Sequence, residues 1–398
     1  MCGIIGYTGN NKAAPILLQG LKSLEYRGYD SAGLGLLSPK GKIIVHRAAG
    51  KLSSLVTSIG DNLPLGSTGI GHTRWATHGS PSVINSHPIQ DCNQEIIVVH
   101  NGIVENYLAL KELLLNDGHK FTSDTDSEVI PHLIENYLSK KYSLKSAVLE
   151  TAAQLKGAHA VVAFYKNDPS ALVAFRLGNA GGLVLGIGEN ETYVGSDLPA
   201  FLPHTRNVVY LRDQELAYIK PNKVTYFNLK GDTLNKELVN IPYNYESVAK
   251  GNYSHFMLKE IEDQAEAVIS SLRSRVDFES STLNLESFPF SDKEIQNFNR
   301  VIFVGMGTSF NAATVGKFWM ESLAGIQADA DNSSEFRYRN PILNSNTLVV
   351  AIGQSGETAD TLGAMEEAIK GNARVITICN VEGSQATHLA EWTLHMRA

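Results

Sequence analysis

The last third of the chain repeats one pattern, in which an apolar strand is followed by a polar loop and a helix. The three repeats are Arg300–Val304 into Phe310–Leu323, Leu348–Ile352 into Ala359–Ile369, and Val375–Cys379 into Ser384–Ala390. Strands that alternate with helices in this way build a parallel sheet with helices packed on its faces. The pattern therefore predicts an α/β domain over residues 254–398.

The first 240 residues follow a different pattern, because their short strands and helices do not alternate regularly. Ser31–Leu37 and Lys42–Arg47 are expected to form a hairpin around the turn Ser38-Pro39-Lys40-Gly41. Gly3–Gly9 is expected to be a buried strand, and Glu128–Leu138 a helix. This mixture predicts an α+β layered domain over residues 1–240 with largely antiparallel sheets.

A linker is expected between the two patterns. Residues 240–253 lack periodicity and contain Pro, Gly and three Asn. We therefore place the linker at residues 241–253.

Charge and cysteine content exclude several classes of protein. The 398 residues include 34 Lys and Arg against 41 Asp and Glu, a mild net charge of −7 that is spread along the chain and argues against nucleic acid or a membrane surface as partner. No apolar run approaches the roughly 18 to 20 residues of a membrane span, and the start of the chain lacks the basic segment of a signal peptide. Three scattered cysteines do not form a disulfide framework, which favours a reducing cytosol.

Cys2 is the first candidate for chemistry, because it directly follows the initiator Met1. Removal of Met1 would leave a thiol beside a free α-amine whose pKa near ~7.7 to 8.0 allows it to accept the thiol proton. Position alone leaves the alternative open that Cys2 only begins a buried strand.

Several long motifs accompany Cys2 in order along the chain. They are Met1-Cys2-Gly3-Ile4-Ile5-Gly6, Glu25-Tyr26-Arg27-Gly28-Tyr29-Asp30-Ser31-Ala32-Gly33, Gly71-His72-Thr73-Arg74-Trp75-Ala76-Thr77-His78-Gly79, His100-Asn101-Gly102-Ile103-Val104-Glu105-Asn106, Ser334-Glu335-Phe336-Arg337-Tyr338-Arg339 and Gln354-Ser355-Gly356-Glu357-Thr358-Ala359-Asp360-Thr361. Together they closely resemble the class II glutamine amidotransferases, and among these the glutamine:fructose-6-phosphate amidotransferases. The resemblance implies an N-terminal-nucleophile αββα sandwich followed by a sugar isomerase (SIS) domain.

The resemblance assigns roles in the hydrolysis of L-glutamine to residues of the first domain. Cys2 is implied to be the nucleophile, and Asn101 and Gly102 match the oxyanion hole, although Asn-Gly by itself is an ordinary turn. Arg74 matches the residue that binds the glutamine carboxylate with its planar fork of donors.

Further residues of the glutamine pocket follow from the same resemblance. Thr77 and His78 are implied to line the pocket, and Trp75 matches a residue that gates the ammonia path. Asp126 matches the residue that receives the glutamine ammonium group. Thr125-Asp126-Ser127-Glu128 is at the same time expected to be a capping box for the helix that follows.

Neither a metal nor a cofactor is predicted. The spacing of the histidines at positions 72, 78, 87 and 100 fits no common zinc pattern, and no second cysteine lies close to them in the sequence. We interpret these histidines as structural or as contacts to substrate.

The second domain is expected to bind a phosphosugar. Gly305-Met306-Gly307-Thr308-Ser309 lies between a strand and a helix, but Phe310 replaces the third glycine of a dinucleotide fingerprint. By resemblance, the phosphate of fructose 6-phosphate is implied to contact four residues. They are Ser309, Gln354, Ser355 and Thr358. Helix capping is the alternative role of these side chains. Gly353 departs from the family, which more often has Ser there.

Length is the larger departure from the family. Relatives carry a second SIS domain with the lysine and the acid–base residues of isomerisation, so the chain is expected to be truncated after its first SIS domain. The sequence thus predicts an enzyme that releases ammonia from glutamine to convert fructose 6-phosphate into glucosamine 6-phosphate, with an incomplete synthase half. A homodimer through the SIS domains is expected. The alternatives are a glutaminase subunit partnered with a separate isomerase chain and a non-catalytic phosphosugar-sensing protein.

Overall fold

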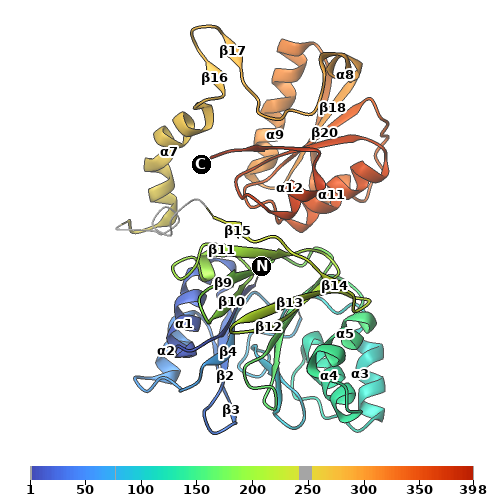
Figure 1. The fold of residues 1–398 in the computed structure, drawn as a ribbon. Helices are drawn as coiled ribbons and strands as arrows, with labels where there is room; N and C mark the ends of the chain where they lie inside the picture. Colours follow the sequence, from blue (N-terminus) through green and yellow to red (C-terminus); the bar gives the residue numbers. More distant parts are fainter. Residues whose placement is uncertain (1, 77, 242–252, 398) are drawn as a thin grey trace. The chain divides into compact units, whose positions relative to one another are not determined.

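The computed structural model describes residues 2–76, 78–241 and 253–397, which form two compact units, Met1–Val248 and Ala249–Ala398 (Figure 1). Most of the predicted linker, residues 242–252, lies outside the described residues. Ile241 belongs to the core of the first unit, since its side chain is fully buried and its N–H donates to the carbonyl of Arg206 over 2.8 Å.

Two antiparallel sheets form the centre of the first unit. In spatial order, the eight-stranded sheet contains β15 (Val239–Asn240), β11 (Asn207–Leu211), β9 (Leu183–Ile187), β10 (Thr192–Gly195), β1 (Gly3–Thr8), β4 (Thr68–Arg74), β2 (Ser31–Leu37) and β3 (Ile43–Ala49). The seven-stranded sheet contains β14 (Thr233–Leu234), β13 (Lys223–Asn228), β12 (Glu215–Lys220), β8 (Leu172–Leu177), β7 (His159–Tyr165), β6 (Ile96–Gly102) and β5 (Ile89–Gln90). The apolar side chains between the sheets form one buried cluster that includes Ile4, Ile97 and Val162.

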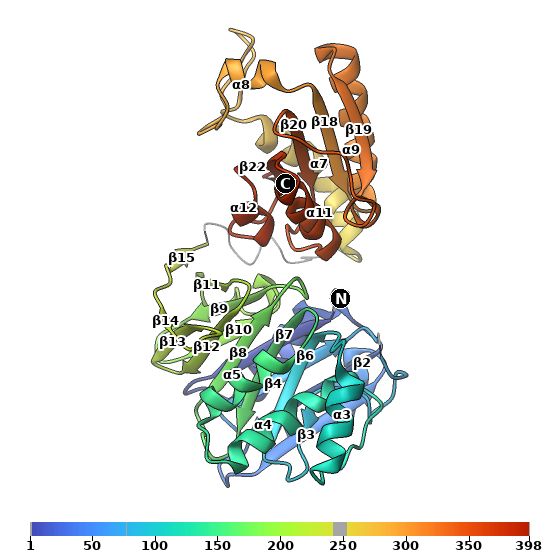
Figure 2. The same ribbon diagram turned by 90° about the vertical axis from the view of Figure 1, so that its right-hand side faces the viewer.

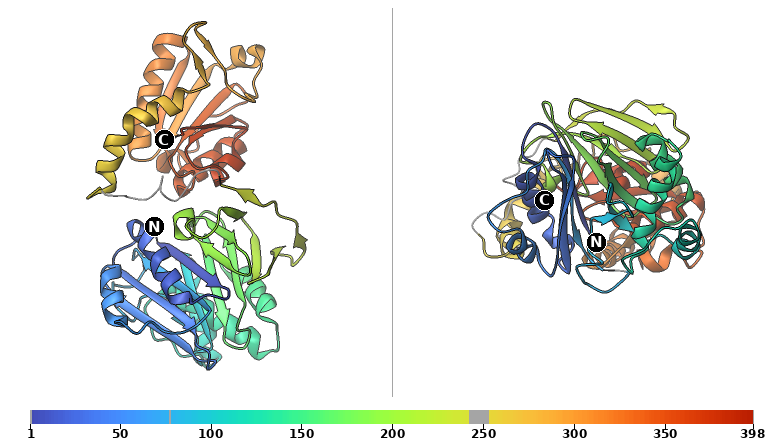
Figure 3. Two further views of the ribbon diagram at one scale, coloured as in Figure 1. Left: turned by 60° about the vertical axis from the view of Figure 1, so that its left-hand side comes forward. Right: turned by 90° about the horizontal axis from the view of Figure 1, so that it is seen from below.

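Helices cover the two outer faces of this pair of sheets. α1 (Ala13–Ser23) and α2 (Leu52–Ile59) pack on the first sheet, and α3 (Tyr107–Asn116), α4 (Val129–Ser139) and α5 (Leu144–Gln154) pack on the second. The view from below shows the blue and the teal helices on opposite sides of the strands (Figure 3). The described residues of this unit also form the 3₁₀ turns η1 (Glu25–Arg27), η2 (Asp126–Glu128) and η3 (Leu198–Ala200). The order of layers is α–β–β–α, which confirms the predicted sandwich.

The second unit is built on a five-stranded parallel sheet. Its spatial order is β19 (Gln327–Asn332), β18 (Arg300–Gly305), β20 (Thr347–Ile352), β21 (Arg374–Cys379) and β22 (Trp392–His395). One face buries side chains of α10 (Ser333–Phe336), α11 (Ala359–Lys370) and α12 (Gln385–Leu389), and the other face buries Ala313 of α9 (Thr308–Trp319). Figure 2 shows α9, α11 and α12 around the strands of this sheet. The remaining elements are α7 (Phe256–Leu272), β16 (Val276–Asp277), β17 (Thr282–Leu283), α8 (Asp292–Asn297) and the π-helical turn η4 (Met320–Ala324). The predicted α/β class is confirmed, while β19 and β22 were not predicted.

Among the helices of the described residues, none combines the length and the apolar character needed to cross a membrane.

Gly20 of α1 provides a test of this packing. In the interior of a helix, alanine is normally more favourable than glycine by about 1 kcal/mol. Here a Cβ at Gly20 would lie 2.7 Å from the carbonyl oxygen of Ala200 and 2.9 Å from Cγ1 of Ile5. We therefore expect Gly20→Ala to destabilise the first unit by about 1 to 3 kcal/mol, measured as the free energy of unfolding in urea.

Ser53→Ala, on the exposed side of α2, is the matched control and should change stability by less than about 0.5 kcal/mol. An increase of stability in Gly20→Ala would contradict the close approach of α1 to the segment around Ala200.

Candidate active site

Cys2 immediately precedes β1, and the backbone of Trp75 contacts its sulfur. The N–H of Trp75 donates to Cys2 Sγ over 3.2 Å, and the thiol lies 3.5 Å from the Trp75 carbonyl oxygen. Burial raises the pKa of the Cys2 thiol, although the Trp75 N–H acts in the opposite direction. The sulfur is therefore held as a thiol at neutral pH, and its attack requires a base.

Asn101 links Cys2 to the second sheet. It lies near the end of β6, its side-chain amide donates to the Cys2 carbonyl oxygen over 3.0 Å, and its Oδ1 lies 3.0 Å from His72 Nε2. Burial lowers the pKa of His72 to about 4, so the ring is neutral and donates from Nε2. The bond from His72 fixes which end of the Asn101 amide faces Cys2.

Gly102 ends β6 in a conformation that suits glycine. Its φ is +131°, and a Cβ there would lie 2.1 Å from the Ala158 carbonyl oxygen and 2.9 Å from His100 Nε2. A side chain is therefore excluded, and the backbone beside Asn101 is left open to a close approach.

Arg74 ends β4 with its buried guanidinium among backbone carbonyls. It donates to the carbonyls of His78, of Gly79 at 3.0 Å and of Ser80 at 3.4 Å. Among the described residues no carboxylate forms an ion pair with it, so its charge is balanced by carbonyl dipoles alone. A buried guanidinium of this kind favours the binding of an anion.

Asp126 lies on η2 with its carboxylate buried. Its Oδ2 accepts the N–H of Val104 at 2.6 Å, and burial raises the pKa of the Asp126 carboxyl while the Val104 N–H and the nearby His78 lower it. His78 in turn lies 3.0 Å from the Tyr107 hydroxyl through its Nε2. Thr77, which was predicted to line the glutamine pocket together with His78, lies outside the described residues.

The expected capping box at η2 is wrong. Thr125 makes no side-chain capping bond, and its hydroxyl is bonded to Ser123 instead. The Glu128 carboxylate accepts the backbone N–H and the hydroxyl of both Thr122 and Ser123. Glu128 therefore ties η2 to the segment before it, and Asp126 projects from that braced turn.

Sequence reasoning missed two charged residues, Asp30 and Arg27, which form contacts within the first unit. Asp30 accepts the N–H of Ala76 and the Ser31 hydroxyl, the latter at 3.1 Å. Arg27 forms an ion pair of 2.7 Å with Asp197. Both lie within the motif of residues 25–33, so the motif marks them, but only the fold shows that Asp30 holds the backbone at Ala76 and that Arg27 pairs with Asp197. Trp75 itself is 48% exposed and packs edge to face against Tyr29.

The four residues predicted to bind the phosphosugar lie at one edge of the parallel sheet. Gly305 and Ile352, the last residues of β18 and β20, pair with each other, so the loops that follow both strands are adjacent. Ser309 lies in the first turn of α9, and Thr358 precedes α11 without making a capping bond. Ser355 Oγ accepts the Glu357 N–H over 3.2 Å, and Gln354 is exposed. The sheet thus brings all four predicted residues to the same edge.

The charged run Glu335 to Arg339 forms ion pairs within the second unit. Arg337 contacts Asp360 at 3.1 Å, and Arg339 contacts Asp331 at 2.6 Å. Asp331 lies on β19, and Asp360 lies in the first turn of α11. The run therefore joins β19 and α11 of the second unit.

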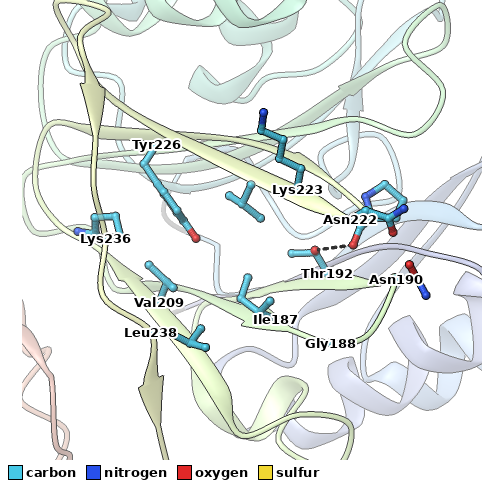
Figure 4. Close-up of a pocket in the computed structure, with 12 residues that line it drawn as sticks. Ile187, Gly188, Asn190, Thr192, Val209, Asn222, Lys223, Tyr226, Lys236 and Leu238 are labelled. Carbon is cyan, nitrogen blue, oxygen red and sulfur yellow. Dashed lines mark hydrogen bonds between the residues drawn. The ribbon is translucent and has the colours of Figure 1, made fainter.

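A hollow elsewhere in the first unit contains none of the predicted residues. It lies against β9, β11 and β13 and is lined by Val209, Lys223, Tyr226 and Lys236 among others (Figure 4). Burial raises the pKa of Tyr226 to about 12, and Lys236 forms an ion pair of 2.6 Å with Glu215. The charge of Lys236 is therefore paired within the fold.

Known families match both units. Residues 72–203 match the glutamine amidotransferase domain, and residues 294–398 match the SIS domain. The chain is 42% identical over 395 residues to the glutamine–fructose-6-phosphate aminotransferase [isomerizing] of Clostridium tetani, covering 99% of this chain and 64% of that protein. It is 44% identical over 407 residues to the protein of the same name from Methanosarcina acetivorans, covering 100% of this chain and 65% of that protein.

A solved structure supports the fold of the chain. Glutamine phosphoribosylpyrophosphate amidotransferase from B. subtilis aligns with a TM-score of 0.51 at 19% identity, covering 95% of this chain and 81% of that one. At this identity the likeness concerns the fold alone.

Fold and site together define a class II glutamine amidotransferase domain of the N-terminal-nucleophile type that is followed by a SIS domain. More narrowly, the chain is similar over nearly its whole length to glutamine–fructose-6-phosphate aminotransferases. It spans 64% to 65% of the length of the relatives quoted above.

Buried histidines give the first unit a predicted dependence on pH. Burial lowers the pKa of four of them, to about 4 for His72 and His159 and well below the usual value for His87 and His100. The unfolded chain therefore takes up protons first as the pH falls. Their contribution to stability is complete above about pH 6.5 and is lost toward pH 4. We expect the free energy of unfolding to fall by about 1 to 2 kcal/mol per buried histidine between pH 7 and pH 5.

Urea unfolding at both pH values measures the change, and histidine NMR resonances report the protonation directly. The ring resonances of these histidines should not titrate above pH 5. Titration of all four near pH 6.5 in the folded protein would contradict the burial of neutral rings.

Proposed function

We propose that the first unit hydrolyses L-glutamine at Cys2 and that the ammonia released converts fructose 6-phosphate into glucosamine 6-phosphate. The observation that carries this proposal is the position of Cys2 just before β1, where the Trp75 N–H contacts its sulfur and the Asn101 amide contacts its carbonyl oxygen. The names of the relatives support both substrates.

In the proposed reaction the α-amine of Cys2, freed of Met1, accepts the thiol proton while sulfur attacks the glutamine side-chain amide. The raised pKa of the buried thiol makes this base necessary. An amide NH₂ has two hydrogens, so Asn101 can hold the Cys2 carbonyl with one and offer the other to the oxyanion, together with the Gly102 N–H. Expulsion of ammonia leaves a glutamyl thioester, which water hydrolyses to glutamate.

Recognition of glutamine is proposed to use two opposite charges. Arg74 would receive the α-carboxylate, displacing part of its bonding to the carbonyls of residues 78–80, and Asp126 would receive the ammonium group. Thr77 and His78 are proposed to line the same pocket, and Trp75 to gate the path of ammonia. This arrangement selects a substrate that carries both charges near its α-carbon.

The proposal predicts that Cys2→Ala abolishes the release of glutamate from glutamine in the full chain. The thiol is the attacking atom, so a loss of at least ~10⁴-fold in kcat is expected. The assay follows glutamate formation, and an intact mass establishes that Met1 is absent from the preparation.

Cys379→Ala, at a buried cysteine of the second unit, is the matched control and should retain the activity. Equal glutamate release by Cys2→Ala and the unchanged chain would remove Cys2 from the mechanism.

The second unit is proposed to bind the phosphate of fructose 6-phosphate through Ser309, Gln354, Ser355 and Thr358. The adjacency of the loops after β18 and β20 supports this assignment, because both loops end at helix N-termini that favour an anion. We further propose residues 1–240 and 254–398 as the two functional domains, a homodimer through the SIS domains, and a location in the cytoplasm.

Gly353 allows the phosphosugar assignment to be tested by a gain of affinity. A Cβ at Gly353 would meet no atom within 4 Å, so a serine can be accommodated. Its hydroxyl would add a hydrogen bond to a charged phosphate worth about 1.5 to 3 kcal/mol. We expect Gly353→Ser to lower the Kd for fructose 6-phosphate by about 10- to 100-fold, measured by calorimetry.

Gly353→Ala supplies the same Cβ without the hydroxyl and should leave the Kd within a few-fold. Equal affinities of the serine and alanine variants would place the phosphate elsewhere.

A further inference from the structure

We propose that Cys92, His119, His132 and Glu135 form a zinc site on the surface of the first unit. Cys92 follows β5, His119 follows α3, and His132 and Glu135 lie one turn apart on α4. The proposal does not depend on glutamine hydrolysis, because none of these residues belongs to the proposed active site.

The four potential ligand atoms converge on one point, since all lie within 4.8 Å of one another. Cys92 Sγ is 3.7 Å from His119 Nδ1 and 3.5 Å from His132 Nδ1. Glu135 Oε2 is 2.9 Å and 3.3 Å from the same two nitrogens. A tetrahedral zinc ion with Zn–N and Zn–O of ~2.0 to 2.1 Å and Zn–S of ~2.3 Å has ligand separations of roughly 3.3 to 3.6 Å. The observed cluster is close to that size.

Hydrogen bonds alone account poorly for this arrangement. The single oxygen Oε2 of Glu135 is approached by Nδ1 of His119, by Nδ1 of His132 and, at 3.3 Å, by the backbone nitrogen of Cys92. A carboxylate oxygen has two lone-pair positions, so three donors compete for it. A central cation resolves the competition, because both imidazoles then direct lone pairs rather than protons toward the centre.

Groups around the cluster hold the ligands in the orientation that a metal requires. His132 directs its other ring nitrogen, Nε2, toward Glu128 Oε1 at 3.6 Å. Asn93 Nδ2 donates to Glu135 Oε1 over 2.6 Å, and the N–H of Lys120 donates to Cys92 Sγ over 3.2 Å. Carboxylates behind a histidine and N–H groups on a sulfur are the outer contacts of metal-bound ligands.

The ligand types select zinc. A thiolate and two imidazoles disfavour Mg²⁺ and Ca²⁺, which take oxygen ligands. Four protein ligands in a tetrahedron describe a structural rather than a catalytic zinc site. The charges of thiolate and carboxylate balance those of Zn²⁺. Cys92 is exposed while His132 is buried, so an ion can reach the site from solvent.

Cobalt binding tests the proposal, because Co²⁺ reports tetrahedral thiolate ligation by visible bands and a sulfur-to-cobalt charge-transfer band. The full chain carrying Cys2→Ser is used, since an N-terminal cysteine with a free α-amine would itself chelate the ion. We expect one equivalent of Co²⁺ with both spectral features, displacement by one equivalent of Zn²⁺, and a raised Tm in the zinc-loaded protein. Adding Cys92→Ser should remove the charge-transfer band, and adding His119→Ala should weaken binding at least tenfold.

Cys379→Ser and His46→Ala, each in the same background, are matched controls that should keep the spectrum. Far-UV circular dichroism of each variant establishes that it is folded. Failure of the folded Cys2→Ser chain to bind one equivalent, or an unchanged spectrum after Cys92→Ser, would overturn the proposal. Neither result would bear on glutamate release by the chain with Cys2 intact.

Discussion

The arrangement of the candidate site in the first unit depends on the side-chain amide of Asn101, because this amide joins the two sheets. Asn101 belongs to β6 of one sheet, whereas Cys2 and His72 belong to the region of β1 and β4 in the other. The two contacts, both of 3.0 Å, leave the amide only one orientation that satisfies both ends. Burial keeps His72 neutral, so the donor role of its Nε2 holds over the range in which a thiol and an α-amine exchange a proton.

Much of this architecture follows from sequence periodicity. The three strand–loop–helix units predict the parallel sheet because β18, β20 and β21 are apolar on both faces and bounded by polar loops. β19 is different, since its sequence Gln-Ala-Asp-Ala-Asp-Asn has little apolar character. It is a strand because all six of its residues pair in register with β18, a tertiary effect that local propensity does not contain.

The candidate site could be predicted in part from the sequence motifs. The motifs indicate Cys2, Arg74 and Asn101 because they resemble those of a known family. In the structure, the side chain of Asn101 and the backbone of Trp75 both contact Cys2. The bracing of Asp126 by Glu128 was not predictable, because Thr125-Asp126-Ser127-Glu128 has the spacing of a capping box. The buried Glu128 carboxylate instead accepts four hydrogen bonds from Thr122 and Ser123. Because the Glu128 carboxylate is buried, four hydrogen bonds to it are more favourable than the role of a solvent-exposed capping residue.

Glu128 also connects the two sites proposed for the first unit. Burial alone would raise the pKa of its carboxyl, but contacts with His132, Ser123 and Thr122 outweigh it and lower the pKa to about 2. The carboxylate therefore stays charged at neutral pH, with His132 on one side and Thr122 and Ser123 on the other. A zinc ion on His132 would keep that imidazole deprotonated at Nδ1 and its Nε2–H directed at Glu128. The metal would thus stiffen the turn that holds Asp126 while lying outside the glutamine pocket, which makes its expected role structural.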